Sequence, residues 1–318
     1  MNSYQEILVK HCNKILTDRR IFNKIVVLCE GQGSILDNKT VVNYGKMERM
    51  PDANFYRKCV PRSWSQGIPV FFNCKGRTGV IDTYFKLLEL NEEDSKNSYL
   101  TPDKLFAIVD LDLQSQNIEN YLFSNTEEIF SNLYQQGQVN EENVNNHRIW
   151  VTGLIHKEAY FIIPELQDTF HNHINIPMYN GQPIVLEDIY ITMADAMINS
   201  EELKNLLPAL SNRISYCTGL DCSDLEKLHD SWKAEFENAQ DENRKNELIR
   251  ALLMIKKVKN KTTQEDYWQQ IKPPIDWTNS EESFRDELLL QIAQFYSEQS
   301  NYAKYHIPYF IQFLRQFI

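Results

Sequence analysis

The stretch "IVVLCEGQGS" at residues 25–34 indicates the fold, because it passes from an apolar run directly into a carboxylate, Glu30, and two glycines. Four of the five residues before Cys29 are apolar. A continuous apolar run of this kind is typical of a strand that is covered on both faces in a parallel sheet. Glu30 then lies at the carboxyl end of the strand, the edge at which open α/β sheets bind ligands. The role of Glu30 therefore depends on its partners elsewhere in the chain.

Three further apolar runs predict strands at residues 68–74, 105–109 and 148–154. Helical periodicity is found at residues 4–16, after the glycine-containing turn "CKGRTG" at 74–79, and at 126–134. Strands that alternate with helices at this spacing predict a parallel sheet wrapped by helices, so we expect an α/β domain over residues 1–170. The polar segment at about 35–67 has no strong periodicity and is expected to be an insertion in this domain.

Beyond residue 170 the pattern changes to helices. Helical periodicity, in several cases with a Ser, Asp or Glu start signal, is found at residues 186–197, 200–214, 223–239, 242–258 and 280–299. Two consecutive prolines predict a connector at 271–277. We therefore expect a mainly helical domain over residues 171–318, whose aromatic end "YHIPYFIQFLRQFI" packs into the core.

The composition is that of a globular protein, with 42% hydrophobic and 24% charged residues in 318. No run of 18 or more apolar residues occurs, so we expect no membrane association. The polar and acidic residues near the start differ from a secretory signal, which predicts a cytoplasmic location. The six cysteines form no CxxC pair, and we expect reduced, packed thiols rather than a zinc site.

Charge is unevenly distributed along the chain. The net charge of −11 argues at first against a nucleic-acid partner, but residues 1–80 hold 13 Lys and Arg against six acids, a net charge of +7. A basic first quarter is compatible with phosphate binding on one face of the protein. Basic residues on a merely solvated surface are the alternative explanation.

A pair of acids, "DLD", follows the predicted strand at 105–109 and places Asp110 and Asp112 at a strand end. Because the carboxyl ends of parallel strands meet at one edge of a sheet, these acids are expected to converge on Glu30 and to repel it. A hard divalent cation resolves such repulsion, and Mg²⁺ or Mn²⁺ prefers carboxylate oxygens. Residues i and i+2 of an extended chain point to the same side, so Asp110 and Asp112 are expected to share the metal while Leu111 packs inward.

Each of these motifs also occurs in ordinary turns, and Asp-x-Asp occurs in phosphatases too, so their order along the chain matters. Glu-Gly after an apolar strand, the Gly- and Lys-bearing turn and Asp-x-Asp after a later strand together resemble the TOPRIM domain of topoisomerases, primases and overcoming-lysogenisation-defect nucleases. "HKEAYFIIPEL" at 156–166 is similar to a Glu-x-Tyr element of the nuclease branch, with Glu158 in the acid position and Pro164 following. The resemblance covers residues 24–166.

The resemblance implies metal-dependent chemistry at a phosphodiester. Glu30 matches the acid/base or metal-binding glutamate of the family. Asp110 and Asp112 match its metal ligands, and Glu158 matches an additional ligand of the nuclease-like sites. The implied cofactor is Mg²⁺ or Mn²⁺, which orients water and stabilises charge on the phosphate.

Phosphate contacts are expected from the glycine-containing turns. Lys75 or Arg77 is expected to neutralise a phosphate oxygen in the transition state. Gly31 and Gly33 allow the backbone to turn tightly and leave room for the phosphate. The family often has a further acid shortly after Glu-Gly, whereas this chain has Ser34 four residues after Glu30.

Two functions of different classes follow. The first is hydrolysis or nicking of nucleic acid, DNA favoured over RNA, in antiviral defence or mobile-element biology. The second is a weak or inactive TOPRIM-like binding or regulatory module that acts with a separate protein. The sequence has no GxxxxGK[ST] motif, so an ATPase partner would be another chain. Self-association is left open, and nothing in the sequence favours a small-molecule substrate.

Overall fold

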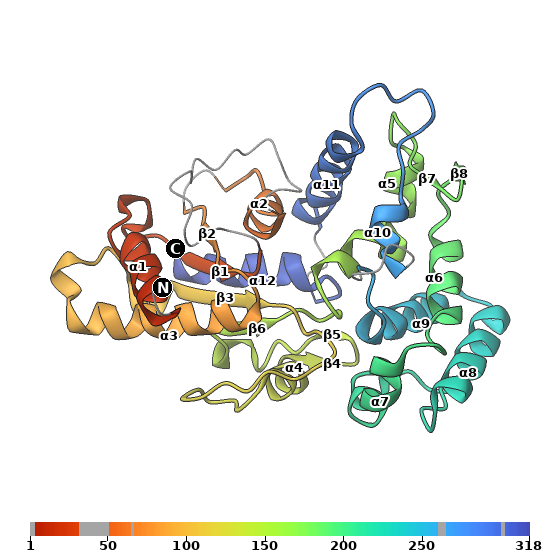
Figure 1. Cartoon of the computed structure of the whole chain (residues 1–318), viewed down its shortest axis with the longest axis horizontal. Helices are drawn as coiled ribbons and strands as arrows, with labels where there is room; N and C mark the ends of the chain where they lie inside the picture. Colours follow the sequence, from red (N-terminus) through yellow and green to blue (C-terminus); the bar gives the residue numbers. More distant parts are fainter. Residues whose placement is uncertain (1–3, 32–50, 65–66, 260–264, 300–302) are drawn as a thin grey trace.

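A four-stranded parallel sheet lies at the centre of the computed structural model, which describes residues 4–31, 51–64, 67–259, 265–299 and 303–318 (Figure 1). The strand order is β2-β1-β3-β6, with β1 at Val26–Cys29, β2 at Val70–Asn73, β3 at Leu105–Val109 and β6 at Ile149–Val151. All four predicted strands are present and all pair in parallel. The expected α/β class is therefore confirmed, and the carboxyl ends of the strands share one edge.

Eight of the helices in the described ranges were predicted from sequence, whereas four short ones, at Pro51–Lys58, Gln167–His171, Tyr267–Gln270 and His306–Leu314, were not. The described helices are α1 Tyr4–Leu16, α2 Pro51–Lys58, α3 Arg77–Glu93, α4 Thr126–Leu133, α5 Gln167–His171, α6 Leu186–Asp195, α7 Glu201–Ile214, α8 Leu225–Asn238, α9 Glu242–Ile255, α10 Tyr267–Gln270, α11 Glu281–Ser297 and α12 His306–Leu314. Five of the described helices after residue 170 begin at a side-chain cap, from Ser200, Asp224, Asp241, Asp266 and Ser280. Two hairpins were not predicted, because strands of two residues are too short to show alternation: β4 Tyr134–Gln135 with β5 Gln138–Val139, and β7 Met178–Tyr179 with β8 Gln182–Pro183.

The strand register determines which helices cover each face of the sheet. Val27 of β1 lies beside Phe71 of β2 and Phe106 of β3, so these side chains share a face. On that face Tyr56 of α2 stacks on Phe71, and Phe313 of α12 packs edge-on against Phe106. Helices α1 and α3 pack together and cover the other face (Figure 1). The sheet is therefore covered on both sides, as its apolar strands predict.

Helix α2 lies in the segment that was expected to be an insertion without regular structure. Its Phe55 and Tyr56 are buried, because they fill the space between β2 and α11. The polar composition of the segment concealed this short amphipathic helix. Residues 32–50, which include Gly33 and Ser34, lie outside the described residues.

The C-terminal part is mainly helical, as predicted. Helices α6 to α10 lie to one side of the sheet, whereas α11 packs on α2 and α12 returns to the sheet (Figure 1). Trp150 of β6 contacts Phe310 and Phe313 of α12 at ring-centroid distances of 5.0 and 5.3 Å. The aromatic end of the chain thus packs into the core, as expected. The division at residue 170 remains a prediction.

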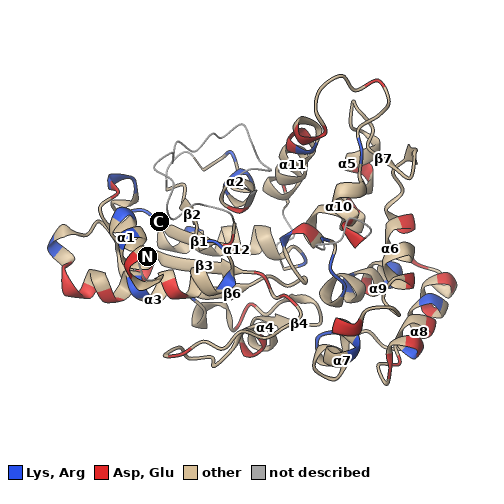
Figure 2. Ribbon diagram, in the orientation of Figure 1, with Lys and Arg blue, Asp and Glu red and all other residues tan. Residues whose placement is uncertain are grey.

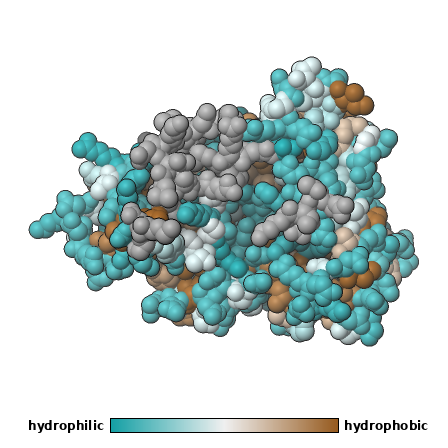
Figure 3. All heavy atoms as spheres, viewed as in Figure 1, coloured by the Kyte–Doolittle hydropathy of each residue, from teal (hydrophilic) through white to brown (hydrophobic). Residues whose placement is uncertain are grey.

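The surface and the cysteines are those of an ordinary folded chain. Acidic and basic residues are interspersed over the helices (Figure 2), and the face in Figure 3 is largely hydrophilic, with small separate hydrophobic patches. All six cysteines are free thiols, and five are buried. Across the described ranges, no helix combines the length and the apolar character that crossing a membrane requires.

Candidate functional site

Three of the predicted acids meet at the carboxyl edge of the sheet. Glu30 follows β1, and its Oε1 accepts a hydrogen bond of 2.8 Å from the backbone N–H of Asp110, which follows β3. Asp110 in turn accepts one of 2.9 Å, at Oδ1, from the backbone N–H of Lys157. Lys157 and Glu158 begin a short 3₁₀ helix, η5 (Lys157–Phe161), after β6. Hydrogen bonds therefore link the ends of β1, β3 and β6 through these carboxylates.

A fourth acid, Asp52, was missed by the sequence analysis. It lies in the first turn of α2, is only 5% exposed, and forms an ion pair with the ammonium group of Lys157. Its charge acts on both Glu30 and Asp110. A further acid was expected within a few residues of Glu30, where the chain has Ser34. The available signal was "PDANFY" at 51–56, a proline and an acid at a helix start before two aromatic residues.

Lys157 places a buried positive charge among the acids. Its side chain is 3% exposed, and its Nζ pairs with Asp52 and lies 3.7 Å from Oε1 of Glu158. Burial disfavours the ammonium form, but the charges of Asp52 and Glu158 outweigh burial and raise the pKa of Lys157. Lys157 therefore remains charged and compensates part of the negative charge of the site.

The acids nevertheless keep an excess of negative charge. Burial first, and then the charges of the neighbouring acids, raise the pKa of Asp110 well above its usual range. Burial also raises the pKa of Glu30 to about 7, and the charge of Asp52 contributes to the rise. The hydrogen bond from the backbone N–H of Asp110 opposes it. The pKa of Asp52 is raised by burial although Lys157 opposes the shift. Raised pKa values of this kind identify a site that would gain from another cation.

Glu158 is the exception, because cations and His156 surround it. Burial opposes its ionisation, but Lys157 and the hydrogen bond from His156 hold the pKa of Glu158 well below its usual value. Nδ1 of His156 lies 2.8 Å from Oε2 of Glu158, and Nε2 of His156 accepts a hydrogen bond of 2.9 Å from the backbone N–H of Val258. Since Nε2 is an acceptor, Nδ1 carries the hydrogen that is donated to Glu158. His156 thus orients the carboxylate.

Asp112 is held differently from the geometry expected. Strand β3 ends at Val109, and Asp112 has a φ of 52°, so the alternation of an extended chain does not continue through "DLD". Leu111 is buried, as expected. The Asp112 carboxylate accepts a hydrogen bond from the backbone N–H of Leu113 and pairs with Lys257 at 3.2 Å. Burial raises the pKa of Asp112, but these interactions outweigh burial and lower the pKa below its usual value. The charge of Asp112 also acts on Glu30.

Two lysines after α9 bring positive charge from the C-terminal part to the acids. Lys257 pairs with Asp112, and Nζ of Lys259 lies 3.6 Å from Oε1 of Glu158. The backbone of Val258, between them, binds His156. A basic run at the end of a helix gave no indication of this role, since cations commonly lie there for electrostatic reasons. The C-terminal part therefore contributes directly to the site.

Of the two predicted phosphate-binding cations, the structure brings one to the acids. Arg77, at the start of α3, donates from Nη1 to the carbonyl of Leu111 at 2.9 Å, and its charge acts on Glu30. Lys75 is exposed, and no contact of its side chain with the acids is found in the described part of the chain; its charge acts on His11 of α1.

Gly31 fits the expected tight turn. Its N–H donates to the carbonyl of Lys75 at 2.6 Å, with a φ of 132° that only glycine adopts readily. A Cβ atom there would lie 2.8 Å from Oδ1 of Asn73. Gly33, which was also expected to leave room for a phosphate, lies outside the described ranges.

The chemistry of the acids suits a hard divalent cation, since they are oxygen donors and three of them have raised pKa values. As the side chains lie, however, no group of three or more His, Cys, Asp and Glu within the described ranges is arranged to hold a metal ion. Lysine ammonium groups compensate the carboxylates instead. A metal would have to displace at least one of them.

Comparison with known proteins adds no relative: no family model matches the chain, and neither a curated protein nor a solved structure shows a significant match.

Proposed function

We propose that the chain is a metal-dependent nuclease with a TOPRIM-like site, which hydrolyses or nicks phosphodiester bonds in nucleic acid, with DNA as the preferred substrate. The observation that supports this proposal best is the linked set of carboxylates at the ends of three parallel strands. Glu30, Asp110 and Glu158 come from separate strand ends, and Asp52 of α2 joins them. A merely structural turn has no need for four acids with this much unfavourable charge.

The residues divide into two roles in this proposal. Glu30, Asp52, Asp110 and Glu158, with Asp112 at the rim, would hold Mg²⁺ or Mn²⁺. When bound, the ion orients a water molecule and stabilises negative charge on the phosphate. Without a bound metal ion the pKa of Glu30 is raised to about 7, so binding of a cation would favour its carboxylate form. Arg77 lies beside these acids and supplies a positive charge for a phosphate oxygen.

A cleavage assay tests the proposal directly. Supercoiled plasmid, single-stranded DNA and RNA are incubated with the protein in Mg²⁺, in Mn²⁺ and in EDTA. We expect metal-dependent cleavage that falls by about 100-fold or more in Glu30→Gln and Asp110→Asn. Glu226→Gln, the same chemical change at an exposed position of α8, serves as the control and should retain full activity. Metal-dependent cleavage that survives both site substitutions would place the active site elsewhere.

A binding or regulatory module is the second proposal, and the lysines favour it. Lys157, Lys257 and Lys259 already compensate Asp52, Asp112 and Glu158, so these three carboxylates are paired without a metal. In this case no substrate is cleaved under any metal condition. Binding of a protein or nucleic-acid partner would then be unaffected by EDTA, and the pair Glu30→Gln and Asp110→Asn would leave that binding intact.

A further inference from the structure

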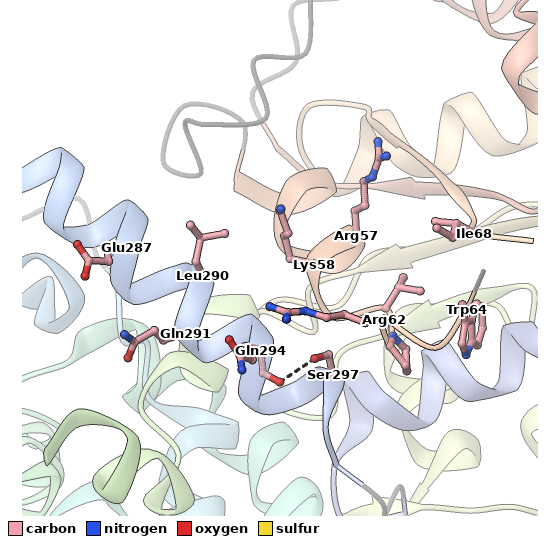
Figure 4. Close-up of a pocket in the computed structure, with 12 residues that line it drawn as sticks. Arg57, Lys58, Arg62, Trp64, Ile68, Glu287, Leu290, Gln291, Gln294 and Ser297 are labelled. Carbon is pink, nitrogen blue, oxygen red and sulfur yellow. Dashed lines mark hydrogen bonds between the residues drawn. The ribbon is translucent and has the colours of Figure 1, made fainter. Parts of the chain in front are cut away.

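A groove lies between α2 with the loop that follows it and α11, outside the set of carboxylates (Figure 4). It encloses about 570 Å³, a volume typical of ligand sites. One wall carries Arg57, Lys58 and Arg62, and the other carries Gln291, Gln294 and Ser297. We refer to it as the α2–α11 groove.

The charge on the α2 wall is concentrated. Arg57, Lys58 and Arg62 lie within six residues of sequence and are all exposed, and Figure 4 shows Arg62 extending from this wall toward α11. Lys58 and Arg62 form no ion pair or hydrogen bond with another described residue. Among the described residues that line the groove, Glu287 is the one acid. Since no described residue compensates Lys58 and Arg62, these two cations favour an anionic occupant.

The α11 wall is mostly polar, and Glu287 is the charged residue that it contributes to the lining. Gln291, Gln294 and Ser297 recur every three residues and therefore share one face of the helix. The opposite face of α11 is buried in the core through Leu288, Ile292 and Tyr296, which fixes the direction of the polar face. Carboxamides both donate and accept hydrogen bonds, as the edges of nucleobases do. Exposed Leu290 and Ile68 add apolar surface for the sugars or bases.

We infer that the α2–α11 groove binds a single strand of nucleic acid, with its phosphates on Lys58 and Arg62 and its bases along the amides of α11. Cations on one wall and amides on the other match the two sides of a single strand, and a volume of about 570 Å³ suits a short stretch of one strand. Trp64 is not a stacking surface, because it is only 6% exposed and its ring faces the guanidinium of Arg315. Binding therefore depends on charge and hydrogen bonds rather than on aromatic stacking.

Helix α2 connects the groove to the proposed active site. The biological meaning of strand binding in the groove rests on the proposed nuclease function. Asp52 lies in the first turn of the helix, among the acids, and Arg57 and Lys58 lie in its last turn, in the groove. The eight residues of α2 span about 12 Å. A strand held in the groove is thus led toward the carboxylates by the same helix that supplies one of them.

Binding is tested without cleavage. Fluorescein-labelled dT20 and rU20 are titrated in EDTA with the wild-type protein and with the double variant Lys58→Gln/Arg62→Gln, at several salt concentrations. We expect the double variant to bind about tenfold or more weakly, and the slope of log K against log salt to fall by about 1.4, the value for two lost phosphate contacts on a single strand. The relative affinities for the two oligonucleotides identify the sugar that is preferred.

The matched control is Lys10→Gln/Lys14→Gln, which removes the same charge from an exposed face of α1. Equal affinities and slopes for the two double variants would overturn the inference, as would wild-type protein that binds neither oligonucleotide or prefers duplex DNA. Circular dichroism confirms that the variants are folded. Oligonucleotide binding that requires Lys58 and Arg62, without cleavage in any metal, would refute the proposed nuclease but support the groove. Cleavage that is unchanged when Lys58 and Arg62 are substituted would support the proposed nuclease but refute the groove.

Discussion

The buried ammonium group of Lys157 gives the sharpest prediction about the site. In Lys157→Met the side chain keeps a similar length, but the charge between Asp52 and Glu158 is lost. Removing one partner of a buried ion pair costs about 3–5 kcal/mol, because the remaining charge is left uncompensated. We expect the free energy of unfolding, measured by urea denaturation at pH 8 in EDTA, to fall by about that amount. This is a large part of the stability of an ordinary domain.

The pH dependence of this loss has a defined sign. Burial raises the pKa values of Asp52 and Asp110 in the folded protein. A carboxyl group with a raised pKa in the folded state stabilises it at low pH, and that contribution is lost as pH rises through the raised pKa. Without Lys157 these pKa values rise further, so the variant loses more stability than the wild type as pH increases. The difference between the two proteins should therefore be smaller at pH 5 than at pH 8.

Two controls separate the buried pair from a general effect of charge. Lys233→Met removes a lysine whose side chain is 38% exposed and pairs with Asp195 at 3.0 Å, and we expect little change in stability. In Asp52→Asn/Lys157→Met both partners are removed, so the double variant should lose less than the two single variants combined. Saturating Mg²⁺ should recover part of the loss in Lys157→Met, about 2.7 kcal/mol at 100 times the dissociation constant. A loss in Lys157→Met no greater than in Lys233→Met would refute the compensating role of Lys157.

Three further predictions follow from the structure. Asp52→Asn should reduce metal-dependent cleavage as strongly as Glu30→Gln does while both proteins remain folded by circular dichroism, and full activity would exclude Asp52 from the site. Burial lowers the pKa of His306 to about 3, so the folded state loses stability as pH falls below about 6.5. At pH 5 the loss is about 2 kcal/mol. The free energy of unfolding of His306→Gln, measured by urea titration at pH 8 and pH 5, should lack this loss. Trp150→Ala should lower the free energy of unfolding by about 3–5 kcal/mol, because its ring is fully buried against α12, and a loss below 1 kcal/mol would contradict this packing.

The sheet could be predicted from sequence because its information is local. Each central strand is a short apolar run with a polar or glycine-containing end, and the helices after β2 and β3, α3 and α4, have periodicity that is visible in a single window. Glu30 and Asp110 were found for the same reason, since each directly follows a predicted strand. The parallel arrangement then brings strand ends together whatever their separation in sequence.

The rest of the site could not be predicted because it depends on tertiary placement. Asp52 enters the site through α2, and the chain between Glu30 and α2 gives no periodic signal that fixes where the helix lies. Lys257 and Lys259 reach Asp112 and Glu158 from a segment about 100 residues or more away in sequence. A lysine run reads the same in sequence whether its charges face water or an acidic site. Similarly, the orientation of Asp112 differs from the expected one because this residue has a left-handed backbone conformation after β3.

The different burial of the lysines indicates where a metal ion would enter the site. Asp112 and Lys257 are 44% and 25% exposed, and Lys259 is 49% exposed, so these pairs contribute little stability and are easily displaced. The pair of Lys157 with Asp52 is almost completely buried and is expensive to break. An incoming divalent ion would therefore displace Lys257 and Lys259 from Asp112 and Glu158 and be held by these acids together with Glu30 and Asp110, while Lys157 stays between Asp52 and Glu158. In the nuclease the proposed ion and Lys157 would then act together as the positive charges of the site, whereas in a binding module the three lysines alone would suffice.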